Sequence, residues 1–291
     1  MRSSIRPARA AAAVLLRSRA TTPSTTASIT HCCSQQIQSR NHTTTTSSSS
    51  SSSVNPAEIS HFSALASSWW DPHGPSRPLH LMNPLRHDFI RRCYSPANPI
   101  PPSTFLDVGC GGGIFAESAA RLPTTTKTTA VDPSAAILSI ARQHAKRDPS
   151  LLHKLEYVNA SIETLRHPKV DVVSCFEVVE HVDYPSEFLD KLGEFVKPGG
   201  WLVMSTIART WTSWVTTNLV AEDILGIVPK GTHDWSKYIN EYELRGYFEK
   251  RLEKWGEIKV MGVVFVPGCG WKEVRGSEKV GNYFLGVQRI A

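Results

Sequence analysis

A glycine-rich turn follows an apolar segment at residues 105–113, which read Phe-Leu-Asp-Val-Gly-Cys-Gly-Gly-Gly. Because glycine has no Cβ atom, Gly109, Gly111 and Gly113 allow positive φ angles and let a ligand approach the backbone closely. The helix expected after the turn, at residues 114–121, offers unpaired N–H groups at its N-terminus. The sequence therefore predicts that a nucleotide-containing ligand binds at this turn.

The spacing of the glycines indicates which nucleotide binds. Counted from Gly109, the third glycine of a dinucleotide motif falls on Ile114, and the Lys-Ser/Thr pair of a phosphate-binding loop is missing. Asp132 follows the next expected strand, 23 residues after Gly109, where a carboxylate can accept hydrogen bonds from both ribose hydroxyls. These residues resemble the S-adenosylmethionine site of a Rossmann-like methyltransferase. A glycine-rich turn that binds no ligand is the alternative.

Two acids and a histidine stand close together after another expected strand. Glu177, Glu180 and His181 occupy positions i, i+3 and i+4, which share one face if the turn is helical. Such a set can hold a divalent metal or supply a general base. Zinc-protease patterns are absent, and a majority of oxygen donors favours Mg²⁺ or Mn²⁺ over zinc. The alternative is a surface helix whose first-turn acids interact favourably with its dipole.

These residues need a sheet to position them. Strands are expected at 104–108, 128–131, 155–158, 170–175 and 201–206, and helices at 114–121, 134–146 and 185–196. This alternation predicts a mostly parallel α/β sheet covered on both faces. Two further strands, residues 258–266 and 282–288, are joined by a polar loop without a helix. We expect them to close a seven-stranded sheet as an antiparallel hairpin.

The composition fits one catalytic domain, expected at residues 54–291, preceded by a tail. The net charge of +6 lies entirely in residues 1–53, which hold six arginines, no lysine and no acid. The remaining chain has 26 basic and 26 acidic residues, so its charge gives no reason to expect nucleic-acid binding. The six cysteines form no Cys-x-x-Cys pair, which argues against a disulfide framework or a zinc knuckle.

Residues 1–53 have the composition of an organelle transit peptide. The first part can form an amphipathic helix with arginines on one side, and its spacing favours a mitochondrial over a chloroplast peptide. Residues 43–53 are a Ser/Thr run that cannot form a core, so we expect a disordered linker there. No segment approaches the roughly 18 apolar residues of a membrane span.

An apolar insertion interrupts the alternation of strands and helices at residues 207–230. It contains Trp211, Trp214 and Leu219, and it follows a strand at the carboxyl edge of the sheet, where ligands of open α/β sheets bind. We expect a lid over an apolar substrate that also contacts a membrane surface. An ordinary helix packed on the domain is the alternative. His233 follows the lid and can orient substrate or simply neighbour a helix cap at Asp234.

Five motifs follow one another along the chain: Trp-Trp-Asp at 69–71, Asn-Pro-Leu-Arg at 83–86, the turn at 107–113, Glu-Val-Val-Glu-His-Val at 177–182 and Pro-Lys-Gly-Thr-His-Asp at 229–234. In content and order this set resembles the mitochondrial ubiquinone-biosynthesis O-methyltransferases. The resemblance covers about residues 58–290. It implies methyl transfer from S-adenosylmethionine to ring hydroxyls of polyprenylated catechols, namely polyprenyl-dihydroxybenzoate and demethylubiquinol. It also implies a peripheral location on the matrix side of the mitochondrial inner membrane, within a multi-subunit biosynthetic complex.

The resemblance also assigns roles to individual residues. Cofactor contacts fall on Arg86, Gly109, Asp132 and Phe176, an Mg²⁺ site on Glu177, Glu180 and His181, and catalysis on Glu180 and His181. Metal coordination would align a catecholate oxygen with the sulfonium methyl and lower the pKa of that hydroxyl. His181 is the general base if no metal binds. Methylation of another small phenol and a non-catalytic scaffold that binds the cofactor are the alternative functions.

Overall fold

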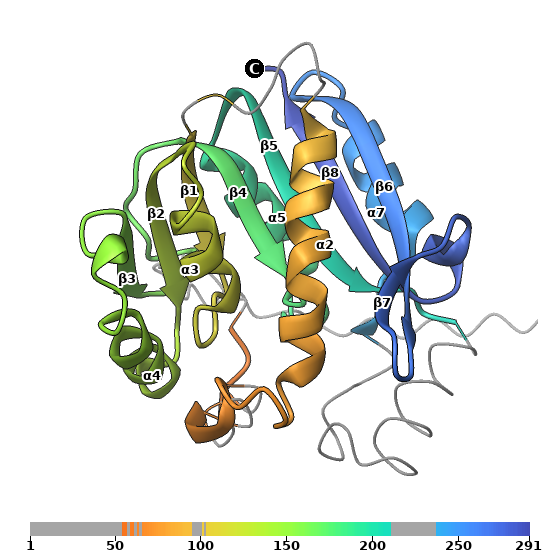
Figure 1. Cartoon of the computed structure of the whole chain (residues 1–291). Helices are drawn as coiled ribbons and strands as arrows, with labels where there is room; N and C mark the ends of the chain where they lie inside the picture. The colour runs from red at the N-terminus through yellow and green to blue at the C-terminus, as the bar shows by residue number, and fades with distance from the viewer. Residues whose placement is uncertain are drawn as a thin grey trace, which may run out of the picture. The chain divides into compact units, whose positions relative to one another are not determined.

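The residues described by the computed structural model form an eight-stranded sheet with helices on both faces (Figure 1). The description covers residues 66–94, 103–210 and 237–291, together with 54–56, 59, 60, 63 and 101. The expected transit peptide, nearly all of the expected lid and the motif at 229–234 therefore lie outside the described residues. Residues 49–291 group as one unit.

The strands are arranged in the order β3-β2-β1-β4-β5-β8-β6-β7. Their bounds are β1 Ser103–Val108, β2 Thr125–Asp132, β3 Leu155–Asn159, β4 Val170–Phe176, β5 Val196–Ile207, β6 Trp255–Val266, β7 Gly270–Glu273 and β8 Asn282–Arg289. The first five in this order are parallel, β8 is antiparallel to both β5 and β6, and β7 is antiparallel to β6. The predicted parallel sheet with an antiparallel C-terminal hairpin is confirmed.

The prediction of seven strands was wrong by one. The loop expected between β6 and β8 contains the short strand β7, whose Trp271 lies opposite Phe265 of β6 with ring centroids 5.4 Å apart. Strand β5 also begins earlier than expected. Val196 already pairs with Val170, and the Lys-Pro-Gly-Gly segment after it forms an irregularity within the strand.

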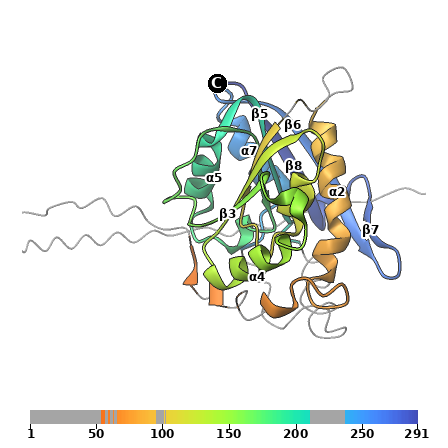
Figure 2. The same cartoon turned by 60° about the vertical axis from the view of Figure 1, so that its left-hand side comes forward.

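Two layers of helices cover the sheet. The helices are α2 Arg77–Cys93, α3 Ile114–Ala120, α4 Ala135–Ala145, α5 Pro185–Glu194 and α7 Glu241–Glu249, with single 3-10 turns η1 Ala66–Ser68, η2 Pro149–Leu151, η3 Val179–His181 and η6 Ser277–Lys279. Helices α2, α3 and α4 lie on one face and α5 and α7 on the other (Figures 1 and 2). Because β1, β4 and β5 are covered on both sides, most of their residues are buried on either face of the sheet.

Local sequence signals account for several helix starts. The Ser134 side chain accepts a hydrogen bond from the Ile137 N–H at the start of α4, and Asn240 and Glu243 form a capping box at the start of α7.

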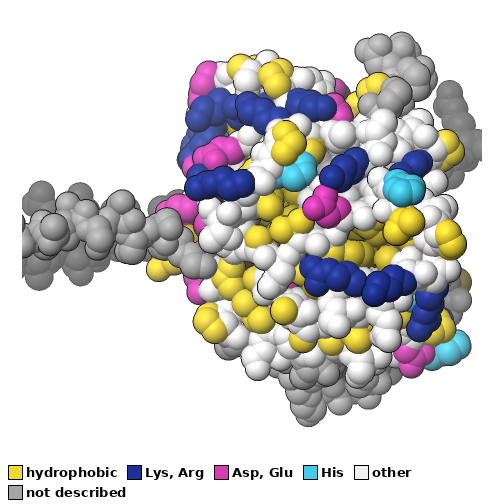
Figure 3. Space-filling view, turned by 90° about the vertical axis from the view of Figure 1, so that its left-hand side faces the viewer, with side chains coloured by type: hydrophobic (Ala, Val, Ile, Leu, Met, Phe, Trp, Pro, Cys, Tyr) yellow, Lys and Arg dark blue, Asp and Glu magenta, His cyan; other side chains and the backbone are white. Residues whose placement is uncertain are grey.

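On the face over β3 and α4, acidic and apolar side chains lie among the Lys and Arg side chains (Figure 3). None of the described helices is both long and apolar enough to cross a membrane.

Candidate active site

The turn between β1 and α3 has the backbone conformation that its glycines predict. Gly109, Gly111 and Gly113 have φ angles of +71°, +52° and +88°. A Cβ atom at Gly109 would overlap the Val178 side chain, and one at Gly113 would overlap the hydroxyl of Tyr157. Glycine is therefore required at these positions both by conformation and by space.

Asp132 connects the end of β2 to this turn. Its carboxylate accepts hydrogen bonds from the Gly111 N–H at 3.0 Å and from the Ser134 N–H at 2.9 Å. Burial raises the pKa of Asp132, and these two backbone bonds oppose that shift. Each carboxylate oxygen has a second lone pair, so Asp132 keeps acceptor capacity for a ligand. Its role in holding the turn was not predicted from the sequence.

Arg86 places a buried cation near Asp107 and over Phe176. Its side chain lies on α2 and is 4% exposed, and its guanidinium sits over the Phe176 ring at 4.9 Å from the centroid. The Nε atom has no hydrogen-bond partner among the described residues. Burial lowers the pKa of Arg86, while the charges of Glu177 and Asp107 act in the opposite direction. An anionic group on a ligand would supply the missing partner.

Phe176 ends β4 and is 7% exposed. Its ring packs edge-on against Phe115 of α3, with centroids 4.8 Å apart, and lies under the Arg86 guanidinium. The resemblance assigns Phe176 a contact with the cofactor. In the described residues its side chain stacks on Arg86, so it positions that cation.

Asp107 is a buried acid that the sequence analysis left without a role. It lies on β1, is 3% exposed and accepts a hydrogen bond from the Ser174 hydroxyl at 2.7 Å. Burial raises its pKa to about 7, although the Ser174 bond and the Arg86 charge lower it. The position of Asp107 just before the glycine turn could have marked it as a site residue. Its raised pKa could not be predicted, because burial and contacts with residues distant in the sequence cause it.

The segment after β4 does not form the helical face considered for Glu177, Glu180 and His181. Glu177 has a φ angle of +55°, and only residues 179–181 form a 3-10 turn. The Glu177 carboxylate accepts a hydrogen bond from the Ser205 hydroxyl at 2.6 Å, and the Glu180 carboxylate accepts one from the Thr206 hydroxyl at 2.8 Å. The assumption of a helix is therefore wrong, because left-handed backbone at Glu177 breaks it.

Glu180 combines deep burial with a neighbouring charge. It is 3% exposed, and burial together with the charge of Glu177 raises its pKa to about 7, while His181 lowers it. A carboxyl group that titrates near neutral pH can both accept and release a proton. Within the described chain, no three His, Cys, Asp or Glu side chains are grouped as a metal site would require.

The site thus combines a glycine turn, a buried cation and several buried acids at the carboxyl ends of β1, β2 and β4. The turn and the carboxylate of Asp132 suit a nucleoside and its hydroxyls, and Arg86 suits a carboxylate. This is the position at which open α/β sheets bind ligands.

Comparisons with known proteins agree with this geometry. The profile of a methyltransferase domain matches residues 80–251. A relative from Schizosaccharomyces pombe, named ubiquinone biosynthesis O-methyltransferase, mitochondrial, is 43% identical over 81% of this chain and 87% of its own length. The protein of that name from Candida albicans is 39% identical over 82% and 86%. The ubiquinone biosynthesis O-methyltransferase of Yersinia enterocolitica is 41% identical over 81% and 95%.

Solved structures share the fold at much lower identity. The plantazolicin methyltransferase BpumL is 17% identical, with a TM-score of 0.56 over 81% of this chain and 97% of that protein. A methyltransferase from Thermotoga maritima is 18% identical, with a TM-score of 0.52 over 80% and 98%. The predicted Rossmann-like methyltransferase fold is confirmed. By its similarity to the relatives above over most of its length, the chain belongs to the ubiquinone biosynthesis O-methyltransferase family.

Proposed function

We propose that the chain transfers the methyl group of S-adenosylmethionine to ring hydroxyls of polyprenylated catechol intermediates in ubiquinone biosynthesis. The names of its relatives support this pathway. The observation that carries the cofactor assignment is the buried Arg86, whose unpartnered Nε lies near Asp107, two residues before the glycine turn. The carboxylate of S-adenosylmethionine supplies the anion that Arg86 lacks.

The remaining cofactor contacts follow from the same arrangement. Asp132 accepts hydrogen bonds from the ribose hydroxyls with the lone pairs that its two backbone bonds leave free. Gly109 allows the adenosylmethionine to lie against the backbone, and Phe176 keeps the Arg86 guanidinium in place. Asp107, with its pKa near 7, lies close enough to Arg86 for the two charges to interact.

Methyl transfer requires an oxygen nucleophile in line with the sulfonium methyl and a group that accepts the hydroxyl proton. Glu180 and His181 are the proposed catalytic residues. Glu180 has a pKa of about 7, close to the value at which a general base works best at neutral pH. The Thr206 hydroxyl, which donates to Glu180, holds that carboxylate at the end of β5.

We further propose that Glu177, Glu180 and His181 bind Mg²⁺. The donor set suits a hard cation, and the repulsion that raises the pKa of Glu180 beside Glu177 would be relieved by one. In the described residues both carboxylates instead accept hydroxyl hydrogen bonds, from Ser205 and Thr206. Bound Mg²⁺ would lower the pKa of the catechol hydroxyl. Calorimetric titration of Mg²⁺ into the wild type and Glu180→Gln, with cofactor affinity as a second readout, tests this site.

We also propose a location for the protein in the cell. Residues 1–53 direct it to mitochondria, and it sits peripherally on the matrix side of the inner membrane within a biosynthetic complex. The mitochondrial names of four relatives support the organelle. The apolar composition of the insertion at 207–230 supports a contact with lipid and with the substrate tail. Replacing Trp211, Trp214 and Leu219 by serine should abolish co-sedimentation with liposomes and preserve cofactor affinity.

The experiment that tests the activity is methyl transfer from labelled S-adenosylmethionine to a prenylated dihydroxybenzoate, with and without a chelator. Label in the extracted lipid product is the expected result. Tight cofactor binding without any turnover would point to the non-catalytic scaffold, and turnover only on unprenylated phenols would point to another phenolic substrate. Full activity of a chelated enzyme that elemental analysis shows to be metal-free would refute the Mg²⁺ part and leave His181 as the base.

A further inference from the structure

Trp69 packs directly on the glycine turn from the segment that precedes α2. It is 7% exposed. A Cβ atom built on Gly111 would lie 2.5 Å from the Trp69 ring, and one built on Gly112 would overlap it. The indole therefore touches backbone that only glycine leaves accessible. It also belongs to a small apolar cluster with Ile114 at the start of α3 and Ile137 on α4.

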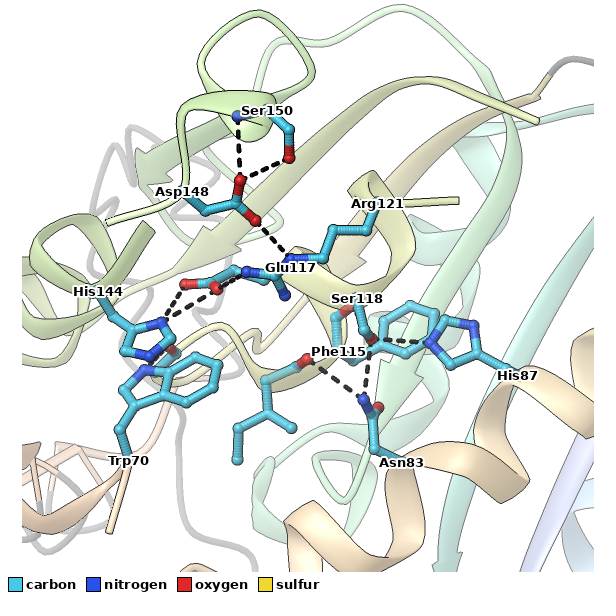
Figure 4. A network of polar contacts seen from close by, with 12 residues as sticks. Trp70, Asn83, His87, Phe115, Glu117, Ser118, Arg121, His144, Asp148 and Ser150 are labelled. Carbon is cyan, nitrogen blue, oxygen red and sulfur yellow. Dashed lines mark hydrogen bonds and ion pairs between the residues drawn. The ribbon is translucent and has the colours of Figure 1, made fainter. Parts of the chain in front are cut away.

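Trp70 holds the same turn through a polar contact. Its indole Nε1 donates a hydrogen bond to the Gly112 carbonyl at 2.9 Å. The ring stacks on the imidazole of His144, with centroids 3.4 Å apart and planes 5° apart (Figure 4). Because Trp70 is only half-buried, it is a poor candidate for a core residue, and its polar atom is directed at the turn.

A buried carboxylate fixes the His144 ring. Glu117, in the first turn of α3, is fully buried, and His144 Nδ1 donates to its two oxygens at 2.8 and 3.1 Å. Arg121 also donates to Glu117 at 2.8 Å, and it donates to Asp148 at 2.7 Å. Figure 4 shows this chain of contacts from Asp148 to Trp70. The stacking partner of Trp70 is thus held rigidly on α4.

Two further hydrogen bonds attach the segment on either side of the tryptophans. His80 Nε2 donates to the Trp69 carbonyl at 2.9 Å, and the hydroxyls of Ser63 and Ser134 lie 2.8 Å apart. Ser134 is also the residue whose N–H binds Asp132. Ser63, Trp69 and Trp70 are therefore connected to the turn, to α4 and to the Asp132 loop.

We propose that Trp69 and Trp70 are positioning residues that clamp the glycine turn in its cofactor-binding conformation. The proposal rests on the cofactor assignment made above. A turn with three positive-φ glycines has unusual conformational freedom when it is not constrained, and α3 begins without a side-chain cap at Gly113. Fixing the Gly112 peptide from outside lowers the entropy that cofactor binding must remove. Loss of the clamp therefore weakens binding and speeds cofactor release without changing the methyl-transfer step.

The test compares Trp70→Phe with a matched control. Phenylalanine can still stack on His144 but cannot donate to Gly112. Trp271→Phe removes the same kind of bond, because the Trp271 Nε1 donates to the Pro78 carbonyl at 2.9 Å and the ring is also half-buried. Calorimetry and stopped-flow displacement measure the affinity and release of S-adenosylhomocysteine. Turnover at saturating S-adenosylmethionine and the melting temperature are measured alongside.

Trp70→Phe should bind S-adenosylhomocysteine about three- to tenfold more weakly, the scale expected for one neutral hydrogen bond, and release it faster. Its kcat at saturating cofactor should stay within about twofold of the wild type, because a residue that acts only on cofactor binding leaves the methyl-transfer step unchanged. Trp271→Phe should change only the melting temperature. His144→Ala, which removes the stacking partner, should shift affinity in the same direction and serves if Trp70→Phe does not fold.

Equal cofactor affinity and release in Trp70→Phe, Trp271→Phe and the wild type would overturn the clamp while leaving the proposed function intact. A fall in kcat at saturation with unchanged affinity would also overturn it. A wild-type protein that binds no S-adenosylhomocysteine would instead overturn the cofactor assignment. The two failures are therefore distinguishable.

Discussion

Replacing Arg86 by methionine should sharply weaken cofactor binding and leave the fold at least as stable as before. The side chain is 4% exposed, and its Nε has no hydrogen-bond partner among the described residues. Its burial lowers the pKa of the guanidinium despite the acids nearby. In the free protein, the buried Arg86 guanidinium therefore lacks an acceptor for one of its N–H groups. The carboxylate of bound S-adenosylmethionine would provide that acceptor.

The substitution should weaken cofactor binding, whereas the stability of the free protein should stay the same or rise. A hydrogen bond to a charged group contributes about 1.5 to 3 kcal/mol, so the dissociation constant should rise roughly 10- to 150-fold. Burying an incompletely paired ion costs several kcal/mol in desolvation, so replacing it by an apolar side chain of similar volume should be neutral or stabilising where no ionised partner is left behind. At about pH 6, Asp107 is mostly protonated because its pKa is about 7, and Glu177, whose charge also acts on Arg86, keeps its hydrogen bond from the Ser205 hydroxyl. Losing the Arg86 charge therefore leaves little uncompensated charge behind.

Calorimetry with S-adenosylhomocysteine and a thermal melt of the free protein at that pH provide the two measurements. Arg92→Met is the matched control, because Arg92 lies on the same helix and forms an exposed pair with Glu273 at 2.7 Å. Arg92→Met should change neither the dissociation constant of S-adenosylhomocysteine nor the melting temperature appreciably. If Arg86→Met bound the cofactor normally but melted at a much lower temperature, Arg86 would be a structural partner of Asp107 and Glu177, and the reasoning would be refuted.

Four further outcomes are expected. Asp132→Ala should weaken cofactor binding by roughly 1.5 to 3 kcal/mol and lower the melting temperature, since its carboxylate also accepts two backbone bonds; an unchanged dissociation constant in a folded mutant contradicts the ribose assignment. Glu180→Gln should lower kcat by about 10², measured by transfer of labelled methyl, and a near-normal rate excludes Glu180 as a base or ligand. The contributions of Asp107 and Glu180 to the free energy of unfolding should fall as pH rises from about 4 to about 7, because these folded carboxyls retain protons that the unfolded chain releases, whereas the partly buried His87, with its pKa lowered to about 4, acts in the opposite direction; urea midpoints of the wild type and Glu180→Gln that change in parallel over this range would falsify the raised pKa of Glu180. Removal of residues 1–53 should leave activity in vitro unchanged, and these residues should carry a reporter into mitochondria; a cytosolic reporter rejects the targeting role.

The parts of the site that depend on local sequence were predictable. The glycine turn was recognised because positive φ angles at Gly109, Gly111 and Gly113 demand that residue type. The acid at Asp132 follows a strand whose apolar residues are contiguous in sequence. The parallel sheet followed from the alternation of strands and helices, which is also read within short windows.

The parts that depend on distant contacts were not predictable. The short strand β7 exists through its pairing with β6, and its Gly, Lys and Glu residues give it no strand signal of its own. The left-handed backbone at Glu177 is favoured by no local turn residue. The contacts of Trp69 and Trp70 with the glycine turn join residues about 42 positions apart in sequence, as the Trp70–Gly112 bond shows.

The place of β8 in the sheet determines the order in which the domain can be completed. It follows every other described strand in the chain, yet it lies between β5 and β6 and pairs with both. Until residues 282–289 have emerged, β6 and β7 therefore have no strand through which to join the parallel part of the sheet. Such non-local pairing slows folding. The chain would thus remain incompletely folded until its synthesis is nearly finished, and removing β8 would separate the sheet into two parts.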